Sequence, residues 1–134
     1  MAKESGLGAS CIVDDVGGTA RTISNDVTST TWTMPSGVQD ITGINNSGYE
    51  RQLLLADFTV TLAGVVNFAA DNSHDVFRHV NLTSVTRTVT LAHSGQTLAT
   101  EDLFNDYVIA RPADASLTWT APGELNSTIV PVWN

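Results

Sequence analysis

Hydrophobic and polar positions alternate along two stretches of this chain with the period of a half-buried β-strand. In residues 54–64, Phe58, Val60 and Leu62 alternate with polar residues. Residues 84–92 repeat the pattern and oppose two valines and a leucine to a second row of threonines. Threonine favours strands but is polar, so each threonine face suits a wet surface better than a dry core. The two rows are Thr59 and Thr61, and Thr86, Thr88 and Thr90.

Weaker patterns predict further strands near both ends. Gly17 and Gly18 lie between two β-branched runs, which predicts a hairpin whose turn needs positive φ angles. Residues 27–34 read as a strand with a weakly marked register, and residues 129–134 as a final strand that contains Trp133.

One short helix is predicted within residues 71–80. Asn72 or Ser73 is placed to cap it, and apolar residues fall on one side. After Gly95, the next apolar residues read as core; they are Leu103, Tyr107 and Ile109.

The segment Ser36 to Leu55 is far longer than a hairpin needs. Long segments inside compact domains tend to be binding elements, lids or disordered linkers. Its apolar side chains, Val38, Ile41, Ile44 and Tyr49, and its terminal leucine run are more than a solvated linker would expose. We therefore expect an ordered binding element.

Length and charge limit the classes of function that the sequence supports. The chain has 134 residues and a formal net charge of -8, which fits one domain, residues 1–134, with a real core. Lys3 is its only lysine, so gripping nucleic acid through clustered cations is disfavoured. No apolar run has membrane length, and we expect a soluble, cytosolically made protein without a membrane partner.

Residues with catalytic potential do not form a convincing set. His74 and His79 are poorly aligned for a shared metal, and Cys11 in strand alternation reads as a small core residue. Two acidic pairs read as solvated edges, since neighbours in a strand point to opposite faces. We expect that the protein has no enzymatic activity and binds no cofactor or metal. The pairs are Asp14–Asp15 and Glu101–Asp102.

Three extensions remain without a use in a monomer: an N-terminal arm (residues 1–10), the long segment (36–55) and the C-terminal strand (129–134). Open sheet edges invite pairing with neighbours. If an extension packs on a different patch of the next copy, the contact is heterologous and builds rings or filaments.

The order of elements from about Gly8 to Trp133 resembles the major tail tube proteins of long-tailed, siphovirus-type bacteriophages. The resemblance lies in the opening hairpin, the long segment with its following strand, the short helix "SHDVFRHV" and the ending "DYVIARPADASLTWTAPGELNSTIVPVW". It rests on order and spacing, since no single motif is specific.

This resemblance implies a mainly β protein, a β-sandwich or half-barrel with one short α-helix. In that family, subunits close into rings, usually hexamers, whose inner sheets form a channel for DNA, and the rings stack. The long segment would then contact the adjacent ring, and Trp133 would anchor to a neighbour. The stacking candidates are Val38, Ile41, Ile44, Tyr49, Glu50 and Arg51.

The resemblance also implies partners and a location. The implied partners are other copies of the protein, a tape-measure protein, tail terminator and tail-tip proteins, and passing double-stranded DNA that is not specifically bound. The implied location is the virion tail, assembled in the host bacterial cytoplasm. A bore of neutral threonines lets DNA slide. One threonine row, Thr59/Thr61 or Thr86/Thr88/Thr90, is thus expected to line the lumen.

Other readings stay open. A head-to-tail joining protein or a capsid decoration protein is also a self-associating virion β-protein, but the first makes a single ring and the second makes trimers or binds capsid alone. A carbohydrate-binding or adhesin module would group its aromatics, whereas Trp32, Trp119 and Trp133 are dispersed. An enzyme would need a concave pocket with perturbed carboxylates.

Overall fold

The computed structural model describes residues 5, 7–82, 84–113 and 116–134. Within these ranges the chain is mainly β with one short α-helix, which confirms the expected fold class. The elements are β1 (Ser10–Asp14), β2 (Ala20–Thr22), the 3-10 helix η1 (Ser24–Asp26), β3 (Val27–Thr33), β4 (Ser36–Asp40), β5 (Arg51–Ala56), β6 (Thr59–Val65), α1 (Ser73–Phe77), β7 (Arg87–His93), β8 (Gln96–Phe104), β9 (Val108–Ala110) and β10 (Thr118–Leu125).

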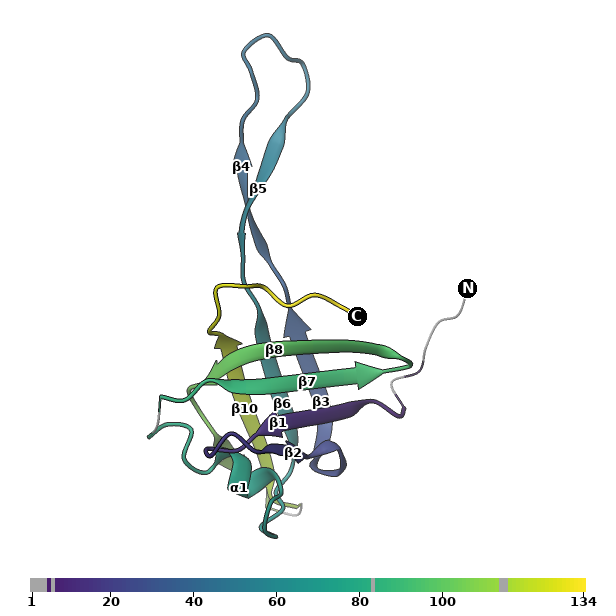
Figure 1. Ribbon diagram of the computed structural model, residues 1–134, viewed down its shortest axis with the longest axis vertical. Helices are drawn as coiled ribbons and strands as arrows, with labels where there is room; N and C mark the ends of the chain where they lie inside the picture. Colours follow the sequence, from purple (N-terminus) through teal and green to yellow (C-terminus); the bar gives the residue numbers. More distant parts are fainter. Residues whose placement is uncertain (1–4, 6, 83, 114–115) are drawn as a thin grey trace.

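One antiparallel sheet folds over itself to make both layers of the molecule. Its hydrogen-bonded order is β2-β1-β7-β8-β10-β6-β3, with β9 also beside β10. Strand β8 meets β10 only near Gly123–Leu125, and from there the layer of β1, β7 and β8 crosses in front of β10, β6 and β3 (Figure 1). Among the described residues, β2 and β3 end the path unpaired, so the barrel is only half closed. We call this sheet together with α1 the body.

The core fills the space between the two layers. Phe58, Leu62 and Val89 are buried as the alternation predicts: Leu62 and Val89 point inward from the middle of β6 and β7, and Phe58 directly precedes β6. Phe77 brings α1 onto the core, with its ring 5.0 Å from that of Trp119. The fifteen buried apolar side chains of the described residues form one cluster, typical of a single domain.

The helix is capped from a distant part of the chain. A side-chain cap from Asn72 or Ser73 was expected, but Asn72 at the N-cap makes no such bond. Instead the buried Asp26 accepts hydrogen bonds from the Ser73 amide and the Asn67 side chain. The Asp26 carboxylate at the end of η1 thus replaces a local side-chain cap, and it connects α1 to the start of β3.

Of the three core residues predicted after Gly95, Tyr107 packs against the core, whereas Leu103 and Ile109 were placed wrongly. Strand β8 places Leu98 and Phe104 inward, whereas Leu103 is only half-buried. Ile109 is exposed because β9 is a short strand at the side of β10. Glycine is required at two positions for different reasons: Gly18 in the β1–β2 turn has φ 84°, and a Cβ on Gly64 would collide with the Asp26 carbonyl.

The three extensions differ from one another. The long segment is two paired strands with a loop at their tip, and the strand expected over residues 54–64 is divided at Asp57–Phe58. Residues 129–134, expected as a strand, have no strand structure because only their last residue pairs with the sheet. Of the N-terminal arm, residues 1–4 and 6 lie outside the described residues, and Ser10 already belongs to β1. No helix in the described ranges has the length and apolar character needed to cross a membrane.

Candidate assembly interface

A β-ribbon projects from the body between β3 and β6 (Figure 1). We call residues 36–56, which comprise β4, β5 and their connection, the ribbon. Cross-strand pairs Val38–Leu53 and Asp40–Arg51 place these side chains on one face, and Gln39–Gln52 lies on the other. A bulge between Ser36 and Val38 changes the register at the base.

Nearly every ribbon side chain is exposed, including its large apolar ones. Leu55 is 93% exposed at the base and Ile44 is fully exposed at the tip. A two-stranded ribbon is only marginally stable alone in water. An apolar ribbon without a covering layer is typical of an interaction surface.

The tip of the ribbon is organised by polar contacts. The Thr42 amide and hydroxyl both donate to Asp40, and the Glu50 amide donates to the Thr42 hydroxyl at 2.7 Å. The hydrogen bond from the Thr42 hydroxyl holds the pKa of Asp40 below its usual range, so this carboxylate stays charged. The guanidinium of Arg51 lies 4.7 Å from the centre of the Tyr49 ring, a cation–π contact.

All six predicted stacking residues belong to this ribbon, and all are exposed: Val38, Ile41, Ile44, Tyr49, Glu50 and Arg51. Whether they contact a second ring stays a prediction. The structure adds Leu53, Leu54 and Leu55, exposed apolar residues that follow the same strand toward the body. The run of three leucines in the sequence is the signal that identifies them.

The two threonine rows lie on different layers of the body. Thr59 and Thr61 face outward from β6 next to Thr33 and Thr31 of β3, and the Thr33 and Thr59 hydroxyls are 2.7 Å apart. Across β10, Thr61 is opposite Pro122. The same outer surface, made by β3, β6 and β10, also has the exposed Glu124 of β10 opposite Thr59.

The second row faces outward from the other layer. Thr88 and Thr90 lie on β7, and the Thr88 hydroxyl donates to Glu101 at 2.7 Å. Thr86 precedes the strand and accepts a hydrogen bond from the Asn126 side chain. Which row lines a lumen stays a prediction, since each row has an exposed glutamate beside it, Glu124 or Glu101.

Trp133 packs against its own chain. Its ring lies 6.1 Å from that of Trp32 on β3, and the backbone of Asn134 exchanges two hydrogen bonds with Thr97. Trp133 is still 39% exposed. A role as an anchor to a neighbouring subunit therefore remains a prediction.

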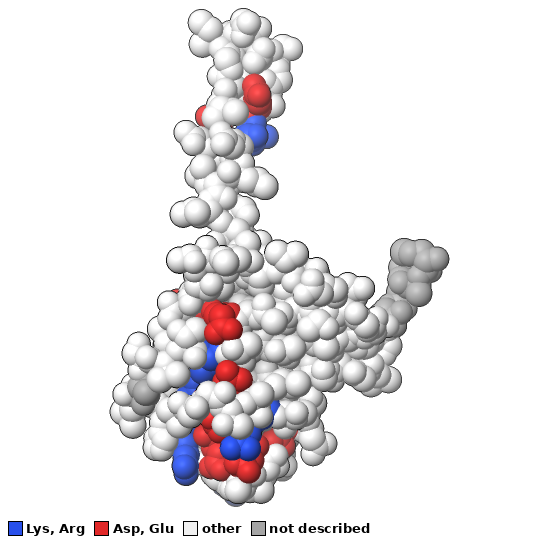
Figure 2. Space-filling model, in the orientation of Figure 1, with Lys and Arg blue, Asp and Glu red and all other residues white. Residues whose placement is uncertain are grey.

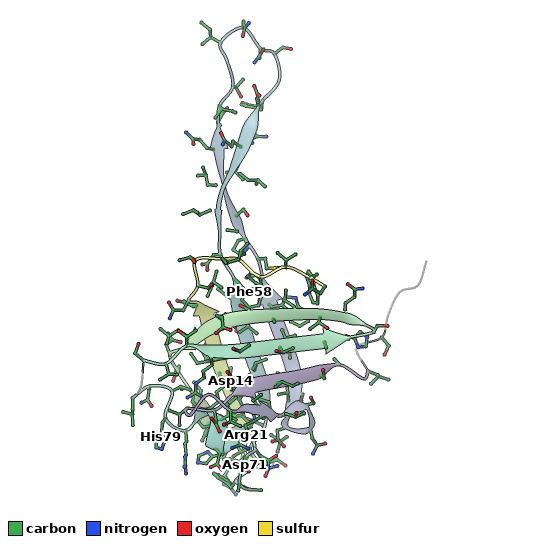
Figure 3. The ribbon with its side chains drawn as sticks, viewed as in Figure 1. Asp14, Arg21, Phe58, Asp71 and His79 are labelled. Atoms are coloured by element: carbon green, nitrogen blue, oxygen red, sulfur yellow. The ribbon has the colours of Figure 1, made fainter. Side chains whose placement is uncertain are left out.

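Charged side chains gather at the end of the body opposite the ribbon (Figure 2). There Arg21 points toward Asp71 beside α1 (Figure 3), with a nitrogen–oxygen distance of 3.2 Å, and it also pairs with Asp15 at 3.0 Å. Strand β3 has no charged side chain, and the ribbon has them only at residues 40, 50 and 51. Charged side chains are thus concentrated at the end of the body away from the ribbon (Figure 2).

The sequence did not reveal two charges in the core. Arg87 and Asp102 are opposite one another on β7 and β8, are almost completely buried, and each keeps one side-chain atom without a hydrogen-bond partner among the described residues. Asp102 was read as a solvated edge and is instead inward-facing, because Glu101 takes the outward position. Burial raises its pKa to about 6.

The other chemical candidates have structural surroundings. Cys11 is a buried core residue, as predicted, and burial raises the pKa of its thiol to about 12. His74 packs its ring 4.7 Å from that of Phe68, while His79 is exposed. In the described part of the chain, no three His, Cys, Asp or Glu side chains gather as metal ligands would.

Comparison with known proteins yields the fold. No protein-family model matches this sequence. No curated protein matches it either. Among solved structures, a chain of the virion of a native gene transfer agent particle is 12% identical, with a TM-score of 0.77 over 98% of this chain and 99% of that one. A chain from the tail of an empty gene transfer agent particle, of C6 symmetry, is 14% identical with a TM-score of 0.78, covering 98% and 99%.

A chain of the anti-feeding prophage baseplate, a six-fold symmetrised structure, is 11% identical with a TM-score of 0.68 over 100% of this chain and 97% of that one. At such identities the likeness concerns the fold. The expected resemblance is therefore confirmed at that level: this chain has, over nearly its whole length, the β-sandwich fold found in phage-like tail structures.

Proposed function

We propose that this protein is a structural subunit of a phage-like tail that self-assembles into stacked, hexameric rings around a channel for DNA. One observation carries the proposal: an ordered apolar ribbon extends from a body that has the fold of tail-structure chains. Such a surface is covered when a second copy packs against it. The protein acts in the virion tail and has no enzymatic role.

The free edges of one layer support ring closure. In that layer β3 has an unpaired side at one end and β9 at the other, within the described residues. Because successive strands from β9 through β10 and β6 to β3 are all antiparallel, β3 runs antiparallel to β9. A neighbour rotated about an axis along the strands thus presents β9 in the right direction to continue the sheet.

The layer that carries the ribbon is the better candidate for the lumen. Its outer surface includes Thr59 and Thr61 beside Thr31 and Thr33, with Glu124 opposite Thr59 and no lysine or arginine in β3, β6 or β10. DNA has one negative charge per roughly 1.7 Å of its axis, so a wall without cations does not hold it. The protein binds passing DNA without sequence preference or tight grip.

Stacking would use the ribbon. Its tip presents the fully exposed Ile44, and residues 41–49 have no charged side chain. An exposed isoleucine at an uncharged tip is suited to a pocket on the adjacent ring. The tape-measure, terminator and tail-tip proteins are then the partners that set the length and ends of the tube.

Electron microscopy of the concentrated protein tests the proposal, alone and with a tail-tip complex as nucleus. We expect hollow tubes of stacked six-membered rings. Isolated trimers, or no assembly under either condition, would contradict it.

The baseplate neighbour favours a second candidate, a ring at the end of a tail or at the head-to-tail joint. Such a protein forms one ring and does not extend it. Single rings that never stack in the same microscopy experiment would identify this alternative.

A further inference from the structure

The outer edge of β8 is only partly covered. Strand β10 pairs with β8 from Asp102 to Phe104, so residues 97–101 have β7 on one side and no strand on the other, among the residues described. The last eight residues of the chain cross this edge, at the base of the ribbon (Figure 1). We call residues 127–134 the strap.

Hydrogen bonds hold the strap to the edge at its last residue, Asn134, and at Asn126, the residue just before it. The Asn126 amide donates to the Glu101 carbonyl at 2.9 Å, and Asn134 exchanges two backbone hydrogen bonds with Thr97, at 2.8 and 2.9 Å. Residues 126–134 therefore span a distance that the five residues 97–101 cover in a strand. The excess length arches away from the sheet.

The arch leaves a position of the β-ladder empty. Ala99 lies between Thr97 and Glu101, so its backbone amide and carbonyl point in the same direction as theirs. Neither group has a partner on that side among the described residues. Below the arch is a cavity of about 320 Å³, lined by Ala99 and by strap residues that include Val130 and Pro131.

The strap itself is poorly packed. Ile129 and Val132 are mostly exposed, and Trp133 meets the body through the ring of Trp32. A β-edge with free backbone groups is a template for an added strand. A segment that pairs at two points and arches between them protects such an edge without completing the ladder.

From these contacts we infer that the β8 edge at residues 97–101 is a docking site for an extended segment of a second copy, and that the strap covers it until assembly. The occupant is a copy of this chain, because this edge already pairs with an extended segment of the same sequence and because copies meet in the proposed rings. The inference thus rests on the proposed function and adds a segment of the chain that restrains assembly. Displacing the strap exposes the Ala99 amide and carbonyl to the incoming strand.

A reversible lock tests this inference. Thr97 and Asn134 form a hydrogen-bonded antiparallel pair, whose Cα separation of about 5.5 Å suits a disulfide. Thr97→Cys with Asn134→Cys, in a Cys11→Ala background, is oxidised with glutathione and observed by electron microscopy and light scattering. We expect no tubes while the lock is closed and normal tubes after reduction. Equal assembly by the oxidised and reduced forms would overturn the inference.

Two further variants address the edge and the strap separately. Ala99→Pro removes the outward amide, and Ala99→Ser, its control, keeps it. We expect only the proline variant to lose assembly, with both remaining folded by circular dichroism. Deletion of residues 127–134 should lower the critical concentration about tenfold, the equivalent of one or two hydrogen bonds no longer broken. A folded deletion variant that assembles less well than the full chain would show that the strap builds the tube rather than restrains it. Failure of the full chain to assemble, even with a tail-tip nucleus, would instead contradict the proposed function.

Discussion

The body and the ribbon are built from the same kind of strand but solve the burial problem in opposite ways. Leu62 in β6 is completely buried beneath the second layer, whereas Leu55, seven residues earlier in β5, is 93% exposed. In the body, each strand has a covered face and an open one. In the ribbon both faces are open, and its apolar side chains have no covering layer within the described part of the chain.

Removing the ribbon gives the largest expected effect on this contrast. Replacing residues 37–55 with a short Gly-Ser linker joins Ser36 to Ala56, which already face each other. We expect tubes to be lost while the free energy of unfolding changes by no more than about 1 kcal/mol, since loop closure depends weakly on length. Electron microscopy and thermal unfolding measure the two effects. Tubes that form without the ribbon would break the comparison.

Two leucine variants test the difference in burial between the body and the ribbon more directly. Leu62→Ala should cost about 2–5 kcal/mol of folding stability, because a cavity opens in a closed core. Leu55→Ala should change subunit stability by less than about 0.5 kcal/mol, as exposed positions do. Assembly of the Leu55 variant should nevertheless weaken. Denaturant unfolding of subunits and the critical concentration of tubes separate the two effects, and a large stability loss at Leu55 would show that the ribbon is supported within its own chain.

The same contrast explains what the sequence could predict. Phe58 and Val89 were placed correctly because a half-buried strand shows its covered face as a period of two. The ribbon was predicted as a binding element, which stays a prediction, but not as paired strands, since its residues show no period of two when both faces are open. The contacts that we propose with other copies depend on the assembly and cannot be predicted from the pattern of one chain.

Buried charges escaped prediction for a different reason. Arg87 shares the inward face of β7 with Val89, and Asp102 shares that of β8 with Phe104, so the alternation itself contained the signal. Charged residues are almost never fully buried without a partner, so both residues were expected at the surface. The fold tolerates both by giving Arg87 the carbonyls of Asp14 and Val76 as acceptors.

Asp102→Asn tests whether a buried carboxylate lowers the folding stability of the body. The ribbon has no buried charge of this kind. Burial raises the pKa of Asp102 from 3.8 to about 6, with the neighbouring Glu101 adding to the shift and a hydrogen bond from Thr100 opposing it. Below about pH 4 the carboxyl is protonated in both the folded and unfolded states and costs nothing. As pH rises through 6 the folded protein must hold a buried charge, so stability falls.

The asparagine variant has no such charge. It should match the natural protein near pH 4 and exceed it above pH 6 by on the order of 2 kcal/mol. Urea unfolding at several pH values measures this difference. A constant difference across that range would show that Asp102 does not titrate in the folded state.

The smallest expected effect concerns the ribbon surface itself. Tyr49→Leu removes the ring beneath Arg51, whereas Tyr49→Phe keeps it, and the exposed cation–π contact is worth about 0.5–1 kcal/mol. Subunit unfolding should change by no more than about 1 kcal/mol in the leucine variant and should not change in the phenylalanine variant, because both side chains are exposed. If the contact orients Arg51 toward a neighbour, the leucine variant alone should raise the critical concentration for tubes by a few-fold. An equal rise in both variants would assign the effect to the hydroxyl group, and unchanged assembly would move the stacking contact away from Tyr49, toward Ile44 at the tip.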